Sequence, residues 1–108
     1  MKLYIGGAYQ GQLELARAEN PDALILADFH ETVQKAMRRG EDARAFAQGV
    51  AAAHPEAVIV ANEVGEGVVP VEAQERAFRE AVGRALCVVA QEARQVTRVV
   101  CGIGVRIK

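Results

Sequence analysis

Residues 3–13 read LYIGGAYQGQL, an apolar run followed by a glycine-rich segment and the first residues of a helical pattern. The apolar run 3–5 stops at two glycines, which is typical of a buried strand that ends in a tight turn. Residues 12–19 then have the spacing of a helix, and the Asn20-Pro21-Asp22 break ends it. A strand, a glycine-rich loop and a helix in this order predict the start of an α/β domain.

The rest of the chain repeats the alternation of buried strand and helix. We expect strands over residues 23–27, 57–61, 96–101 and 105–107, and helices over residues 30–39, 42–53 and 72–94. Strands that are apolar throughout and separated by helices predict a mostly parallel sheet with helices on both faces. The tight turn before the last strand predicts an antiparallel hairpin at the C-terminal edge. A length of 108 residues suits one domain, so we expect a single domain over residues 1–108.

Composition and charge exclude several classes of partner. The net charge is −1 and the chain has no Trp, so neither a basic nor a base-stacking surface for nucleic acid is expected. No apolar stretch approaches the length of a membrane span, which predicts no membrane partner and a cytoplasmic location. Cys87 and Cys101 form no metal or disulfide motif, and we expect both to be buried thiols.

The loop after the first strand has the glycine spacing of a phosphate-binding loop, G-x-x-x-x-G-K-[ST]. The candidate phosphate-binding residues are Gly6, Gly7, Ala8, Tyr9, Gln10, Gly11 and Gln12. Gln12 replaces the lysine that neutralises phosphates, and Leu13 replaces the hydroxyl that holds Mg²⁺, so phosphoryl transfer should fall by orders of magnitude. Backbone N–H groups and the helix N-terminus still favour an anion. The alternative is a glycine-rich turn without a ligand.

Two further strand ends carry polar residues. Ligands of open α/β sheets bind at the carboxyl ends of the strands, so these segments should converge with the glycine loop on one crevice. Asp28 is a candidate Mg²⁺ ligand, or else the N-cap of the next helix, with His30 and Glu31 as polar residues of its first turn. Asn62 opens the other segment. Several arginines follow on helices, and one of them is a candidate phosphate contact that the sequence does not select: Arg38, Arg39, Arg76, Arg79 and Arg84.

Three segments of the second half carry a family signature. Residues 62–70 read NEVGEGVVP, residues 78–84 read FREAVGR and residues 99–108 read VVCGIGVRIK. Together they resemble the adenosylcobinamide kinase/adenosylcobinamide-phosphate guanylyltransferase family, in register from about residue 57 to residue 108. The match of residues 5–8 and 22–28 to the glycine loop and acid-ended strand of that family is looser.

The resemblance implies a fold, an activity and a site. It implies a three-layer P-loop NTPase fold of the RecA-like type, with the spatial strand order 2-3-1-4-5, and a homotrimer. Enzymes of the family phosphorylate adenosylcobinamide with a nucleoside triphosphate and then transfer GMP through a guanylylated histidine. The implied ligands are a corrinoid and a nucleotide, GTP or ATP, with Mg²⁺. The implied crevice adds Asp28, Asn62, Glu63, Gly65 and Arg84 to the loop.

Departures from the family pattern shape the functional expectation. Besides Gln12 and Leu13, the segment that carries the guanylylated histidine has no counterpart, and neither His30 nor His54 lies where it would be. We therefore expect a relative in cobalamin biosynthesis with lost or weakened phosphoryl and nucleotidyl transfer and residual nucleotide or corrinoid binding. Two alternatives stay open: an active enzyme that completes its site across a trimer, and a non-catalytic structural or partner-binding module.

Overall fold

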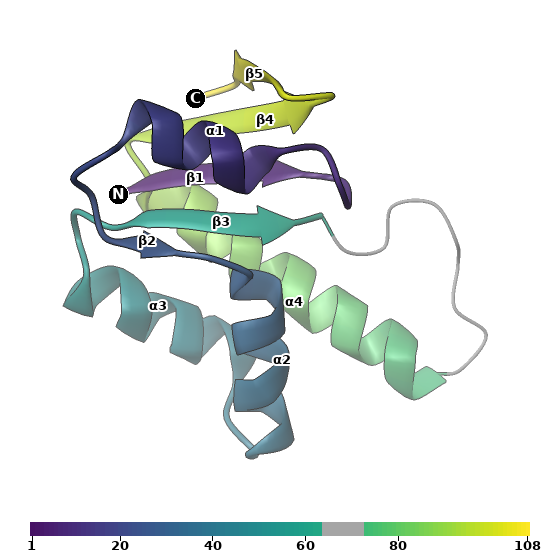
Figure 1. Ribbon diagram of the computed structural model, residues 1–108. Helices are drawn as coiled ribbons and strands as arrows, with labels where there is room; N and C mark the ends of the chain where they lie inside the picture. The colour runs from purple at the N-terminus through teal and green to yellow at the C-terminus, as the bar shows by residue number, and fades with distance from the viewer. Residues whose placement is uncertain (64–72) are drawn as a thin grey trace.

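A computed structural model describes residues 1–63 and 73–108 of the chain as an α/β fold (Figure 1). The strands are β1 (Lys2–Gly6), β2 (Ile25–Leu26), β3 (Val58–Asn62), β4 (Gln95–Val100) and β5 (Ile103–Arg106). The helices are α1 (Gln12–Glu19), α2 (Phe29–Arg38), α3 (Ala43–Ala53) and α4 (Ala73–Glu92). None of the helices in the described residues has the length and hydrophobicity needed to cross a membrane.

The five strands form one mixed sheet in the order β2-β3-β1-β4-β5. β1 pairs in parallel with β3 and β4, β2 pairs in parallel with β3, and only β5 is antiparallel, to β4. This confirms the expected fold class and strand order, and it is the arrangement of a P-loop NTPase-like sheet. Parallel pairing brings the carboxyl ends of β1, β2 and β3 to one edge, where their loops meet.

Side chains of the central strands alternate between two cores. Leu3 and Ile59 face the side covered by α2, α3 and α4, whereas Tyr4, Val58 and Val60 face the side covered by α1. Figure 1 shows this layering, with α1 alone on one face of the sheet and the other three helices on the other. Strands buried on both faces explain why their sequences are apolar throughout.

Three expectations about local structure need correction. β2 is only two residues long, because Asp28, at φ 52°, turns the chain into α2 directly after this edge strand. The final hairpin turns at Cys101 and Gly102, both with positive φ as a two-residue turn of its type requires, and not at residues 102–104. The prediction of buried thiols is wrong, since Cys87 and Cys101 are both exposed and free.

A buried hydrogen-bond network joins β1 to the end of α1. The Tyr4 hydroxyl donates to Glu19 Oε1 at 2.7 Å and accepts from Asn20 Nδ2 at 3.0 Å. Asn20 Nδ2 also donates to the Ala16 carbonyl, and Lys2 Nζ donates to Asn20 Oδ1 at 2.9 Å. Burial, followed by the hydrogen bond to the Glu19 carboxylate, raises the pKa of Tyr4 above its ordinary value of 10.0. The folded protein therefore keeps this proton at a pH where the unfolded chain has lost it.

This raised pKa predicts a loss of stability in base. The contribution of Tyr4 to the free energy of unfolding should be fully present below about pH 10. It should decline as the pH rises further, because the unfolded state then binds fewer protons than the folded state. Tyr4→Phe should lower the free energy of unfolding by about 1 kcal/mol near pH 8 and should flatten the decline toward about pH 11. Urea unfolding at several pH values measures both effects. Tyr9→Phe, at a fully exposed tyrosine, is the control and should leave the profile unchanged.

Candidate functional site

The loop between β1 and α1 is built tightly at both of its ends. A Cβ on Gly6 would lie 2.5 Å from the Val99 carbonyl oxygen, so only glycine fits where β1 passes β4. Gly11 has φ 87° at the N-cap of α1 and offers no side chain as a cap. Gln10 fixes the middle of the loop, since its Oε1 accepts from the Cys101 N–H and its carbonyl accepts from the Gly102 N–H, each at 2.7 Å. The loop is thus held against the β4–β5 turn.

The side chain of Gln12 holds the loop against β3 on the other side. It is 5% exposed, and its Nε2 lies 2.8 Å from Asn62 Oδ1 and 3.0 Å from the Gly7 carbonyl oxygen. The carbonyl oxygens of Gly6 and Ala61 lie further away, at 3.3 and 3.4 Å. Because an amide nitrogen carries two hydrogens, the two shortest contacts are the main hydrogen bonds. The position expected for a phosphate-binding cation is therefore a neutral donor whose hydrogens are already used by the protein.

Leu13 also lacks the chemistry of the position that it occupies. Its side chain packs against the core formed by Tyr4, Val58 and Val60, and it has no oxygen to offer a metal. Within residues 1–63 and 73–108, no three His, Cys, Asp or Glu side chains cluster in a way that would hold a metal ion. The loop therefore offers a Mg²⁺–triphosphate neither the cation nor the hydroxyl that phosphoryl transfer uses.

A hollow of about 800 Å³, here called the loop hollow, lies where the loop meets the ends of β2 and β3. Its described lining contains three carboxylates, from Glu14, Asp28 and Glu31, and no lysine or arginine. Asp28 stands at the N-cap of α2, but its side chain makes no capping hydrogen bond. Tyr9 also lines the hollow and is fully exposed. The convergence of strand ends is therefore present, but a phosphate would meet mostly negative charge there.

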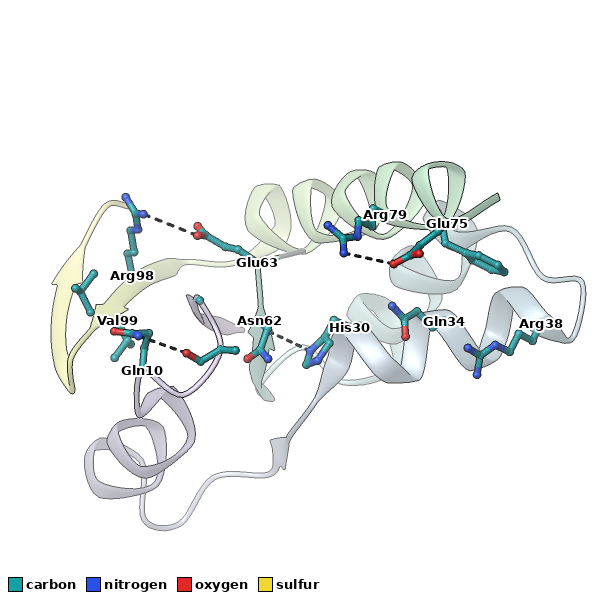
Figure 2. A pocket seen from close by; sticks show the side chains of 14 residues that line it. Gln10, His30, Gln34, Arg38, Asn62, Glu63, Glu75, Arg79, Arg98 and Val99 are labelled. Atoms are coloured by element: carbon teal, nitrogen blue, oxygen red, sulfur yellow. Dashed lines mark hydrogen bonds and ion pairs between the residues drawn. The ribbon is translucent and has the colours of Figure 1, made fainter. Parts of the chain in front are cut away.

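A second hollow of about 840 Å³, here called the α2–α4 cavity, opens on the other side of the loop (Figure 2). Its floor is the edge where β1, β3 and β4 end, and α2 and α4 form its two sides. Its described lining residues are Gly7, Ala8, Gln10, His30, Gln34, Arg38, Asn62, Glu63, Glu75, Phe78, Arg79, Arg98, Val99 and Val100. Among the arginines that the sequence did not distinguish, the structure brings Arg38 and Arg79 to this cavity.

His30 lies between the two hollows and is the residue that sequence reasoning undervalued. Its side chain is 8% exposed, and its Nδ1 accepts a hydrogen bond from the Asn62 backbone N–H at 3.0 Å. Since Nδ1 acts as the acceptor, the ring proton is on Nε2. A histidine nucleophile would need a free lone pair, which this arrangement does not offer. The only sequence signal for His30 was its position two residues after Asp28 at a strand end.

The other predicted crevice residues do not all lie at the hollows. Glu63 lies at the rim of the α2–α4 cavity, where its carboxylate is 3.9 Å from the Arg98 guanidinium. Arg84 is not part of either hollow, because it pairs with Glu80 on the exposed side of α4 and lines a separate depression near α3. Gly65 lies outside the described residues. The assignment of Asp28 as a metal ligand stays a prediction.

Comparisons with known proteins agree with the fold. Residues 14–107 match the model of the family described as cobinamide kinase / cobinamide phosphate guanyltransferase. Over 51 residues the chain is 49% identical to the bifunctional adenosylcobalamin biosynthesis protein CobU of Escherichia coli K12, and equally to the protein of that name from Salmonella typhimurium LT2. The aligned part is 47% of this chain and 28% of each relative.

The contacts of Gln12 predict a structural role that substitution reveals. Gln12→Leu keeps a similar volume but leaves buried carbonyl oxygens and Asn62 without their donor, so it should lower the free energy of unfolding by about 1–3 kcal/mol. Gln12→Glu should lower it further, because a carboxylate would face the same acceptors. Urea unfolding provides the measurement, with the exposed Gln48→Leu as control. Unchanged midpoints for both Gln12 variants would show that these hydrogen bonds do not hold the loop.

Proposed function

The chain belongs to the cobinamide kinase / cobinamide phosphate guanyltransferase family, and from this membership we propose that it serves adenosylcobalamin biosynthesis as a binding protein. It takes a nucleotide such as GTP, or a corrinoid, and its phosphoryl and nucleotidyl transfer are lost or weakened. We further propose that it acts in the cytoplasm. Because the aligned part is 28% of the relatives' length, the activity named for them is not carried over whole.

One observation carries the proposal, and it is the state of Gln12. The amide occupies the interior of the loop and donates to Asn62 and Gly7, so this position supplies no positive charge to a bound phosphate. A lysine there and a hydroxyl at the next position are what the phosphate-binding loop uses to stabilise charge in the transition state. Their replacement supports binding without efficient transfer.

The geometry of His30 supports the same conclusion for nucleotidyl transfer. With Nδ1 accepting from the Asn62 N–H and the proton on Nε2, the ring has no lone pair to attack a phosphorus atom. The described residues offer only one other histidine, His54, which is exposed at the C-cap of α3. A chain that forms no covalent nucleotidyl histidine still has two hollows beside the loop in which to bind ligand.

Calorimetric titration with GTP, ATP and adenosylcobinamide tests the proposal. We expect at least one of the three to bind to the wild-type protein, and no phosphorylated or guanylylated product to form. In the double variant Gln12→Lys/Leu13→Ser, the affinity for Mg²⁺–GTP should rise at least about tenfold, because a charge-assisted contact contributes about 1.5–3 kcal/mol.

Matched variants separate a restored site from a change in net charge. Gln48→Lys makes the same chemical change at an exposed position of α3 and should leave the affinity unchanged. Leu13→Ser alone supplies the hydroxyl without the cation and should raise the affinity for Mg²⁺–GTP only slightly. Product formation by the wild-type protein would instead favour an active enzyme. No detectable binding of any of the three ligands would favour a non-catalytic module. Either result contradicts the proposal.

An exposed apolar strip on the last hairpin supports self-association, which we propose as the homotrimer that the family resemblance implies. Val100 pairs with Ile103 in the register, and Ile103, Val105 and Ile107 are exposed. They lie on the sheet face opposite α1, because the intervening Gly104 faces Leu15 of α1. Exposed apolar groups gathered in this way mark interaction surfaces.

Light scattering after size-exclusion chromatography measures the assembly. We expect the mass of a trimer for the wild-type protein and a smaller mass for Val105→Lys, which introduces a charge into the strip. Ala18→Lys, which introduces the same charge at an exposed position of α1, is the control and should keep the larger mass. A wild-type monomer at about 50 μM would contradict the proposal.

A further inference from the structure

Three hydrogen-bond donors line one side of the α2–α4 cavity. His30, Gln34 and Arg38 are spaced four residues apart along α2, so they lie on one face of that helix. Figure 2 shows them in a row along α2, with Arg79 and Glu75 of α4 across the cavity. At 1.5 Å of rise per residue, the Cα atoms of His30 and Arg38 are about 12 Å apart. The long Arg38 side chain leans toward the helix N-terminus, and so toward the other two.

The Nε2–H group of His30 is open to solvent in the wall of the cavity and has no hydrogen-bond partner among the described residues. The residue as a whole is 8% exposed, and its Nδ1 accepts a hydrogen bond from the Asn62 N–H. Water is the remaining partner of this donor, and a ligand oxygen that reproduces the hydrogen bond can replace that water. Because this donor lies in the cavity wall, a ligand atom with a lone pair could accept its hydrogen bond.

The charges of the cavity favour an anion. Its described lining carries three arginines and two glutamates. Each glutamate has an arginine beside it, with Glu75 at 3.4 Å from Arg79 and Glu63 at 3.9 Å from Arg98. Arg38 is the third arginine and forms no hydrogen bond or ion pair with the described residues. The loop hollow, in contrast, presents three carboxylates and no lysine or arginine in its described lining.

We infer that the α2–α4 cavity, and not the loop hollow, binds the phosphate group of a small phosphomonoester. The phosphate oxygens accept hydrogen bonds from His30 Nε2, the Gln34 amide and the Arg38 guanidinium, whose planar fork suits phosphate. Phe78 of α4 provides an aromatic wall for the organic part of the ligand. A volume of about 840 Å³ is within the range of small-molecule sites. This inference does not require the loop to bind a nucleotide.

Titration of ¹⁵N-labelled protein with inorganic phosphate and with phenyl phosphate, at constant ionic strength, tests the inference. We expect a saturable shift of the His30 Nε2–H resonance with both probes, because a phosphate oxygen accepts a hydrogen bond from this group. Phenyl phosphate should bind more tightly than phosphate, because its ring contacts Phe78. His30 lines both hollows, so the shift is assigned to the α2–α4 cavity by Arg38→Gln, at a residue that lines this cavity and not the loop hollow. Its outcome is therefore separate from the nucleotide titration of the loop variants.

Neighbouring arginines provide the matched control. Arg38→Gln should weaken both probes about tenfold or more. Arg39→Gln removes the same charge one residue along the chain, where the side chain pairs with Glu41 outside the cavity, and should change the affinity less than about twofold. Gln34→Leu should also weaken binding. Equal losses of affinity for Arg38→Gln and Arg39→Gln would overturn the inference. So would the absence of a saturable shift of the His30 Nε2–H resonance with up to about 50 mM phosphate.

Discussion

The hydrogen bonds of the buried Gln12 amide are the constraint on which this edge of the protein depends. Through Asn62 and Gly7 they join the β1–α1 loop to the end of β3, two segments fifty residues apart in the chain. Because the donor is neutral and already satisfied, the loop is stabilised by its own protein contacts. A lysine at this position would leave its charge available to a phosphate, whereas the two hydrogens of the Gln12 amide are used by Asn62 and Gly7.

Asn62 joins the Gln12 contacts to His30, and two hollows of different charge lie beside this junction. Asn62 accepts from Gln12 through its side chain, and its backbone N–H donates to His30, so one residue orients both partners. On one side of this junction lies a hollow lined by three carboxylates and no lysine or arginine, and on the other a cavity lined by three arginines and two glutamates. An anion approaching the ends of the strands therefore meets net negative charge in the loop hollow and a small excess of positive charge in the α2–α4 cavity, which is the more favourable side.

The pattern of strands and helices was largely predictable, but the site was predictable only in part. Apolar strands alternating with helices led to the correct sheet, and the expected crevice at the strand ends exists. The predicted length of β2 was too great, because the apolar Leu24 was assigned to the strand but is exposed at the sheet edge. Arg84 was assigned to the crevice by resemblance, but the direction of a side chain on a long helix depends on packing that no motif encodes.

By itself the sequence determined the order of elements, the family and the absence of a lysine and a hydroxyl from the glycine loop, because these follow from local pattern and residue chemistry. Only the tertiary structure decided what Gln12 does instead, which arginine faces a cavity, and which nitrogen of His30 carries the proton. Each of these depends on atoms that are distant in the chain and adjacent in space. Hydrogen bonding and charge act over a few ångströms, so they are set by the folded arrangement and not by the order of residues.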